Sequence, residues 1–196
     1  MEIQSVRPQY DQSWTLFLDR DGVVNDEIIG SYVTNWDEFV FAEGALNALQ
    51  SLASRFGTIV IVTNQRGVGR GIMEMADLRD INARTYQAIE AAGGRIDKIY
   101  ACTAVADTDH NRKPNVGMAL QAKEDFPQID FRRSVIVGNS LSDMEFGKRV
   151  AMRTVFLTTK LSPVQLPHPL VDEQWSSLAE WVDSLVAAAE VSSLNR

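Results

Sequence analysis

Five short apolar segments recur along this chain, and a polar or glycine-rich stretch follows each of them. The segments cover residues 14–18, 58–63, 96–101, 134–138 and 154–157. They are too short for helices and rich in Val, Ile and Phe, which is typical of strands that are buried on both faces. Each segment is therefore expected to be a strand of a sheet that other elements cover.

Longer stretches with helical spacing separate the apolar segments. They cover residues 43–56, 75–92, 116–126, 141–150 and 175–194. In the first of them, Leu46, Leu49 and Leu52 fall on one stripe, and Gly57 suits the position after a helix. Strands that alternate with helices predict an α/β fold of three layers, in which a mainly parallel sheet is covered on both faces.

Length and composition limit the domain organisation and the class of partner. A chain of 196 residues fits one domain, residues 1–196, with a core over about 14–160 and a last helix over about 174–194. A net charge of −7 and no basic run argue against a nucleic-acid or anionic membrane partner. One cysteine, no apolar run of membrane-spanning length and no signal-peptide profile predict a cytoplasmic protein. The oligomeric state is left open.

Ligands of such sheets bind at the carboxyl ends of the strands. After the first segment come Asp19 and Asp21, which lie on the same side of an extended chain because they are two positions apart. Neighbouring carboxylates repel each other, so a bound cation or a raised pKa on one of them is expected. One could then act as a nucleophile and the other as an acid. The alternative is a polar turn that closes the strand.

The second segment ends at Thr63, and Asn64, Gln65 and then three glycines with Arg66 and Arg70 follow. Hydroxyl, amide and guanidinium donors beside glycines suit an anion whose oxygens approach the backbone. The spacing matches neither the phosphate loop of nucleotide-binding proteins nor the dinucleotide fingerprint. The alternative is a flexible glycine loop.

The third and fourth segments also lead to polar residues. Arg112 and Lys113 precede a proline after the third segment, and Asn139 and Asp143 follow the fourth. Asn139 and Asp143 could both face a metal or a phosphate, or Asn139 or Ser140 could cap a helix. Because chemically useful side chains follow four different strands in order, the joint pattern favours a functional site.

These residues resemble the four motifs of the haloacid dehalogenase superfamily of phosphohydrolases. The matching positions are Asp19 and Asp21, Thr63, Lys113, and residues 139–143. Within the superfamily, the stretches FLDRDGVVN, VTNQRGVGRG and RKPNVGM look like the D-glycero-D-manno-heptose 1,7-bisphosphate phosphatase group. The histidinol-phosphate phosphatases are the similar alternative. The resemblance implies a Rossmann-like parallel sheet, a domain without a large cap, and Mg²⁺-dependent hydrolysis of a small phosphorylated metabolite.

The resemblance also implies a role for each matching residue. Asp19 is the expected nucleophile that forms an aspartyl-phosphate, and Asp21 protonates the leaving alcohol and later activates water. Thr63 and Lys113 are expected to hold the phosphoryl oxygens. The expected metal ligands are Asp19, Asp21, Asn139 and Asp143, and the expected substrate contacts are Asn64, Gln65, Arg70 and Arg112, with Arg66 as a further candidate for a second phosphate.

Two departures from the group leave other hypotheses open. The group usually has Asp where this chain has Asn139, and an uncharged amide predicts weaker Mg²⁺ binding. The group often has a zinc loop where this chain offers only Cys102 and His110, so no zinc is expected. A non-catalytic binding protein on a phosphatase fold is therefore an alternative. Phosphoryl transfer to an acceptor other than water would use the same residues and is a further alternative.

Overall fold

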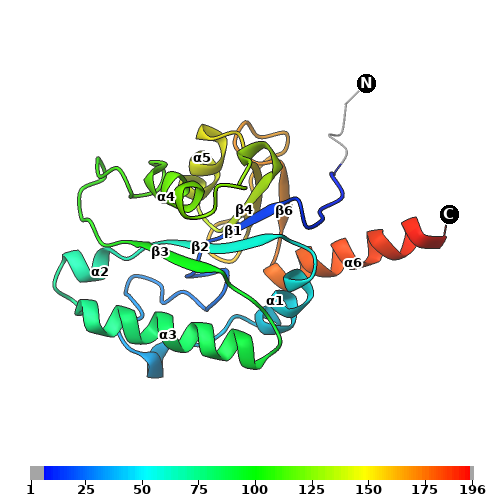
Figure 1. Ribbon diagram of the computed structural model, residues 1–196. Helices are drawn as coiled ribbons and strands as arrows, with labels where there is room; N and C mark the ends of the chain where they lie inside the picture. Colours follow the sequence, from blue (N-terminus) through cyan, green and yellow to red (C-terminus); the bar gives the residue numbers. More distant parts are fainter. Residues whose placement is uncertain (1–6, 195–196) are drawn as a thin grey trace.

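The computed structural model describes residues 7–194, which form a central six-stranded sheet with helices on both sides (Figure 1). The strand order is β3-β2-β1-β4-β5-β6, and all neighbouring strands are parallel. The strands are β1 (Thr15–Leu18), β2 (Thr58–Asn64), β3 (Lys98–Cys102), β4 (Ser134–Gly138), β5 (Arg153–Leu157) and β6 (Glu173–Trp175). The predicted parallel sheet is therefore confirmed.

The sixth strand is the main departure from the expected elements. Strand β6 pairs with β5, and Glu173 lies opposite Val155. The helical pattern predicts a last helix that includes Trp175, but α6 spans Leu178–Leu194 and therefore begins later. The three residues of β6 are only half-buried and contain no apolar run, because they form the edge of the sheet. A hydrophobic pattern could not reveal such a strand.

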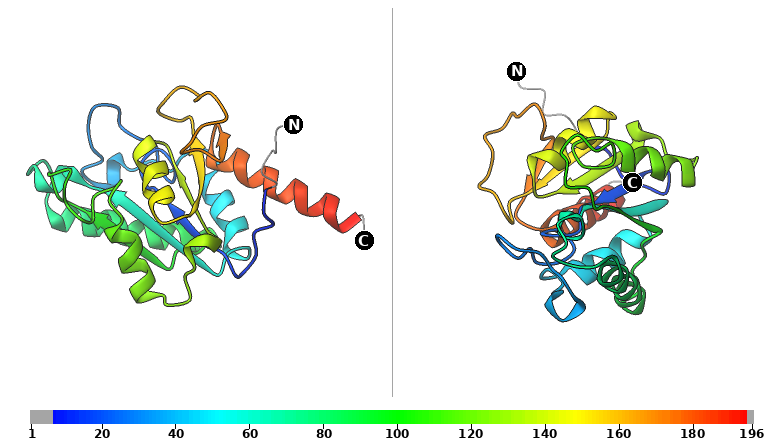
Figure 2. Two further views of the ribbon diagram at one scale, coloured as in Figure 1. Left: turned by 90° about the horizontal axis from the view of Figure 1, so that it is seen from above. Right: turned by 90° about the vertical axis from the view of Figure 1, so that its left-hand side faces the viewer.

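Alternating side chains of the strands form a core on each face of the sheet. Leu16 and Leu18 belong to the core on one face, whereas Phe17 belongs to the core on the other, as the two-residue period of a strand requires. Helices α1 (Ala45–Ala53), α3 (Met75–Ala91) and α6 cover the first face. Helices α4 (Gly117–Asp125) and α5 (Leu141–Arg149) cover the second (Figures 1 and 2). The three predicted layers are thus confirmed.

The connection between β1 and α1 forms one wall of the functional site. It contains a short 3-10 turn, η1 (Trp36–Glu38), which contacts α3. The Trp36 ring stacks on Phe39 at a centroid distance of 5.0 Å, and Phe39 belongs to a small apolar cluster that includes Leu78 and Ile81 of α3. This packing fixes the connection against the body of the molecule.

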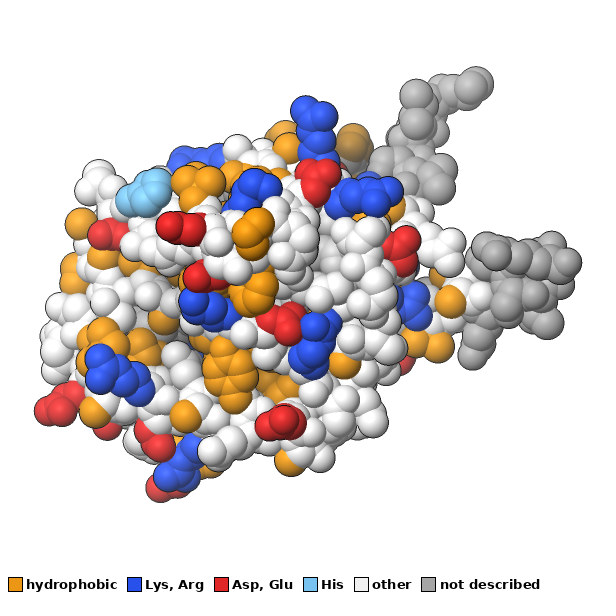
Figure 3. Space-filling model, in the orientation of Figure 1, with side chains coloured by type: hydrophobic (Ala, Val, Ile, Leu, Met, Phe, Trp, Pro, Cys, Tyr) orange, Lys and Arg blue, Asp and Glu red, His pale blue; other side chains and the backbone are white. Residues whose placement is uncertain are grey.

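Within residues 7–194, none of the helices is both long enough and apolar enough to cross a membrane. On the face drawn in Figure 3, acidic and basic side chains are interspersed and do not gather into a patch of one sign.

Candidate active site

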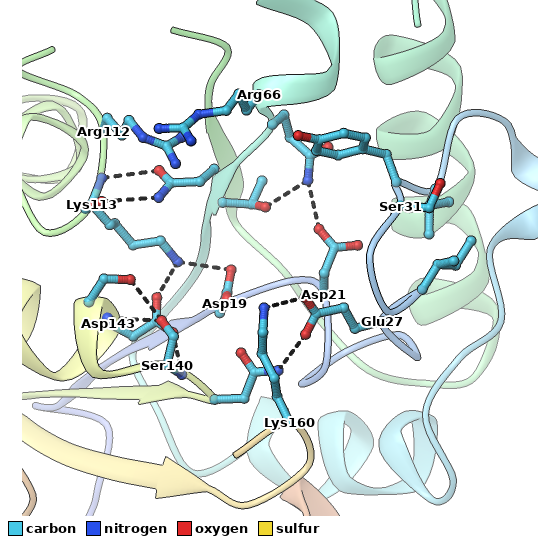
Figure 4. A pocket seen from close by; sticks show the side chains of 18 residues that line it. Asp19, Asp21, Glu27, Ser31, Arg66, Arg112, Lys113, Ser140, Asp143 and Lys160 are labelled. Atoms are coloured by element: carbon cyan, nitrogen blue, oxygen red, sulfur yellow. Dashed lines mark hydrogen bonds and ion pairs between the residues drawn. The ribbon is translucent and has the colours of Figure 1, made fainter. Parts of the chain in front are cut away.

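A cavity of about 260 Å³ opens where the carboxyl ends of β1, β2 and β4 meet. Strand β1 lies between β2 and β4, so the chain leaves it in one direction along the sheet and later returns on its other side. Ligands of open α/β sheets bind at such a switch point. The cavity is lined by most of the predicted site residues, namely Asp19, Asp21, Thr63, Asn64, Gln65, Arg112, Lys113, Asn139 and Asp143 (Figure 4).

Lys113 joins two carboxylates at the bottom of the cavity. Its Nζ lies 2.8 Å from Oδ1 of Asp19 and 2.6 Å from Oδ1 of Asp143 (Figure 4). Burial, followed by the nearby charge of Asp143, raises the pKa of Asp19 to about 7, although Lys113 opposes this shift. Burial alone would lower the pKa of Lys113, but the two carboxylates raise it. Lys113 is therefore charged, and it offsets part of the negative charge of Asp19 and Asp143.

Asp143 is held from two sides, which positions Lys113 in turn. Ser140 is the N-cap of α5, and its backbone N–H and side-chain hydroxyl donate to Oδ2 of Asp143 at 3.0 and 2.6 Å. The expectation of a helix cap near Asn139 or Ser140 is thus confirmed for Ser140. Both carboxylate oxygens of Asp143 have protein partners, so its contact with a metal remains a prediction.

Asp21 points into the cavity and is surrounded by donors. Burial alone would raise its pKa, but Arg20, Asn25 and Gln65 together hold the pKa of this carboxyl below its usual value. Nη2 of Arg20 contacts both carboxylate oxygens at 3.0 and 3.1 Å. Arg20 itself is fully buried, and its guanidinium lies 5.8 Å from the centre of the Phe39 ring. Asp21 is therefore ionised in the ligand-free protein.

The residues at the end of β2 connect the other parts of the site. Nε2 of Gln65 donates to Thr63 Oγ1 at 2.8 Å and to Asp21 Oδ2 at 2.7 Å. The Asn64 side chain binds the backbone of Lys113, accepting from its N–H at 3.0 Å and donating to its carbonyl at 3.1 Å. These amides thus connect Asp21 and the backbone of Lys113 to the end of β2.

Two arginines on the rim share one carboxylate. Arg66 and Arg112 both line the cavity, and both contact Oδ1 of Asp107, a residue whose side chain is 82% exposed. Arg70, a predicted substrate contact, does not line the cavity and instead donates to the Tyr32 hydroxyl at 3.0 Å. The short helix α2 (Arg66–Gly69) turns Arg70 outward, whereas it leaves Arg66 over the cavity.

Asn139 lies at the end of β4 and presents an amide to the cavity. Its Nδ2 donates to Oε2 of Glu27 at 3.2 Å, and Glu27 pairs with Lys160 at 2.5 Å (Figure 4). Gly22 has a φ of +80°, and a Cβ on it would lie 1.8 Å from this nitrogen, so only glycine leaves room for the amide.

The oxygen atoms in the cavity suit a magnesium ion. Asp19 and Asn139 supply a carboxylate and an amide oxygen from neighbouring strands, and Mg²⁺ prefers such hard oxygen ligands. No three His, Cys, Asp or Glu side chains converge as a metal site within the part of the chain that the structure describes. A cation here would therefore also depend on the amide oxygen and on main-chain carbonyls.

The loop between β3 and α4, where related proteins were expected to carry zinc, is held by hydrogen bonds. Asp109 accepts from the thiol of the buried Cys102 at 3.5 Å and from the backbone N–H of Asn111 at 2.9 Å. The Asn115 amide donates to the carbonyl of Asp109 at 2.8 Å. The expectation of no zinc stays a prediction.

Three charged residues in or beside the cavity, Arg20, Glu27 and Lys160, were not predicted from the sequence. Arg20 lies between Asp19 and Asp21 in the chain, and this position was the available signal. Glu27 and Lys160 are separated by 133 positions, so no local pattern could pair them.

Several known proteins resemble this chain in sequence. The family model described as "Polynucleotide kinase 3 phosphatase" matches residues 11–153. The D-glycero-alpha-D-manno-heptose-1,7-bisphosphate 7-phosphatase of Mycobacterium bovis is 39% identical over 139 residues, which cover 70% of this chain and 73% of that protein. The D-glycero-beta-D-manno-heptose-1,7-bisphosphate 7-phosphatase of Helicobacter pylori is 31% identical and covers 86% of this chain and 94% of its own.

A solved structure agrees with these sequence matches. The D,D-heptose 1,7-bisphosphate phosphatase of B. bronchiseptica, complexed with magnesium and phosphate, superposes with a TM-score of 0.79 at 27% identity. The match covers 89% of this chain and 99% of that one.

Proposed function

Because this chain belongs to the haloacid dehalogenase-type phosphatases, in the group of the heptose-1,7-bisphosphate 7-phosphatases, we propose that it hydrolyses a phosphomonoester of a heptose 1,7-bisphosphate. The observation that carries the proposal is the Asp19–Lys113–Asp143 arrangement at the bottom of a cavity with a cationic rim. A nucleophile, a charge that stabilises phosphoryl oxygens and room for a sugar phosphate come together there.

Asp19 is the nucleophile of the proposed reaction. A carboxylate oxygen of Asp19 bonds to phosphorus while the bond from phosphorus to the sugar oxygen breaks, and water then releases phosphate from the aspartyl-phosphate. Mg²⁺, held by Asp19, the main-chain carbonyl of Asp21 and Asn139, would supply positive charge that keeps Asp19 ionised and neutralises the phosphoryl oxygens. Lys113 and Thr63 bind those oxygens and position phosphorus.

Asp21 moves the protons of both half-reactions. It gives a proton to the leaving sugar oxygen in the first and takes one from water in the second. Arg20 and Gln65 keep it ionised in the ligand-free protein, which suits the second half. The negative charge of an arriving phosphate raises the pKa of a neighbouring carboxyl, which favours the protonated form that the first half needs.

The rim binds the second phosphate of a bisphosphate. Arg112 and Arg66 lie over the same cavity and can exchange the exposed Asp107 carboxylate for a phosphate, to which guanidinium groups bind with two parallel hydrogen bonds. Arg70 lies outside the cavity and contributes through Tyr32, which lines it.

The proposed function also includes the cellular compartment and the binding partners. The protein acts in the cytoplasm on a small metabolite, as one domain and without a nucleic-acid or membrane partner. Its single cysteine, Cys102, is buried, which suits a reducing compartment.

Phosphate release with and without Mg²⁺ tests the proposal. The panel holds both anomers of heptose 1,7-bisphosphate, other sugar phosphates and histidinol phosphate, with Asp19→Asn as the inactive control. We expect Mg²⁺-dependent release that is fastest with a heptose bisphosphate and absent in the control. Equal release by the Asp19→Asn variant, or no release from any compound by the folded protein, would contradict it.

A further inference from the structure

Glu27 links two parts of the site that are distant in sequence. Its Oε2 accepts from Nδ2 of Asn139 at 3.2 Å, and its Oε1 accepts from Nζ of Lys160 at 2.5 Å. Figure 4 shows Glu27 and Lys160 joined on one side of the cavity, and Lys113 with its two carboxylates on the other. Because Lys160 neutralises Glu27, the main effect of Glu27 on Asn139 is to accept a hydrogen bond rather than to add charge.

The orientation of the Asn139 amide decides whether this residue can bind a cation. An amide carries an acceptor oxygen and a donor nitrogen, and only the oxygen ligates Mg²⁺. In the structure, Nδ2 of Asn139 donates to Glu27. The same nitrogen lies close to Gly22, where a Cβ would not fit. Among residues 7–189, whose side chains the structure describes, no donor bonds to Oδ1 of Asn139, so this oxygen is left for the cavity.

We propose that Glu27 is a positioning residue that fixes the Asn139 amide with its oxygen toward the metal position. The proposal rests on the function proposed above, because that function places Mg²⁺ beside Asp19 and Asn139. An aspartate in place of Asn139 would need no such partner, since its two oxygens are alike. Asn139 therefore needs the acceptor that Glu27 supplies, because only one end of an amide can bind the ion.

Calorimetric titration of the metal-free protein with Mg²⁺, in the absence of substrate, tests this role. We expect Glu27→Ala to raise the Kd for Mg²⁺ about fivefold to tenfold, as the loss of one hydrogen bond allows. Glu27→Met, which keeps the side-chain length without an acceptor, gives the same loss. Glu27→Gln keeps an acceptor oxygen and changes Kd by less than about twofold. Asp26→Ala removes the same charge one residue away and serves as the matched control.

The decisive comparison repeats Glu27→Ala in the Asn139→Asp background. We expect no rise in Kd there, because either oxygen of an aspartate can bind the ion. An equal rise in both backgrounds, a loss in Glu27→Gln as large as in Glu27→Ala, or no loss in any Glu27 variant would overturn the proposal. The proposed function fails differently, through the absence of phosphate release from every sugar phosphate, which this metal titration does not involve.

Discussion

Replacing Lys113 should expose how strongly the site depends on one buried charge. Its Nζ contacts Asp19 at 2.8 Å and Asp143 at 2.6 Å, and its side chain is 1% exposed. Lys113→Met keeps the volume but leaves two buried carboxylates without a cation. Removing one partner of a buried ion pair costs about 3–5 kcal/mol, and for a chain of this size each kcal/mol lowers Tm by about 2–4 °C. We therefore expect Tm to fall by about 6–20 °C at pH 8.

The fall in Tm of Lys113→Met should be larger at high pH than at low pH. The pKa of folded Asp19 is raised to about 7, whereas an unfolded Asp titrates near 4. Between these values the folded state holds a proton that the unfolded state has released, so the free energy of unfolding falls as pH rises. Without Lys113 the pKa of Asp19 rises further, and the gap in Tm between variant and wild type should be wider at pH 8 than at pH 5.

Thermal unfolding followed by circular dichroism, without Mg²⁺, measures both effects. Lys148→Met is the matched control, because Lys148 pairs with Asp172 at 2.6 Å but is 29% exposed. Such a pair near the surface is worth about 0–1 kcal/mol. A Tm loss in Lys113→Met no larger than in the control, or a loss equal at both pH values, would refute the reasoning.

Three further predictions concern neighbouring parts of the site. Gly22→Ala should weaken Mg²⁺ binding and lower Tm, because the added Cβ would lie 1.8 Å from Asn139 Nδ2. Gly71 also has a positive φ, but a Cβ there would have no neighbour within 4 Å, so Gly71→Ala should show only the backbone cost of about 1–2 kcal/mol. Asp19→Asn should raise the Tm of the metal-free protein at pH 8 more than at pH 5, and equal shifts in two unfolding scans would contradict the raised pKa of Asp19. Arg112→Ala should raise KM for a heptose bisphosphate by about tenfold, because one charge-assisted contact with the second phosphate is lost. KM for a sugar monophosphate should stay nearly unchanged. An equal rise of KM for both substrates in steady-state assays would contradict a contact between Arg112 and the second phosphate.

The sequence predicted the parts of the fold that depend on burial. Central strands are continuous apolar runs, so β1, β2 and β4 could be predicted from these runs alone. The residues that follow them could then be placed at the edge of the sheet where the strands end. Strand β6 escaped because an edge strand needs no apolar run. The start of α6 shifted for the same reason, since Trp175 belongs to the sheet.

Two features of the site could not be predicted from the sequence: the direction in which a side chain points, and contacts between residues that are far apart along the chain. Asp19 directly follows β1, Lys113 lies in the loop between β3 and α4, and Asp143 lies in the first turn of α5. All three line one cavity, because the segments after these parallel strands meet at the same edge of the sheet. Arg70 follows a strand too, but α2 intervenes and turns it outward, and strand-end reasoning cannot foresee a short helix. The partner of Asn139, Glu27, could be found only when residues 112 positions apart were brought together in space.

The topology of the sheet also bears on when catalytic competence arises during folding. Thr15 of β1 lies opposite Thr58 of β2 on one side and Ser134 of β4 on the other, so the second pairing closes a much longer loop. Longer loops lose more chain entropy on closure, and parallel pairings of distant segments form slowly. Asp19 meets Asp143 only after β4 has docked beside β1. Phosphatase activity should therefore return later in refolding than the helical circular dichroism signal, and turnover would report complete assembly rather than collapse.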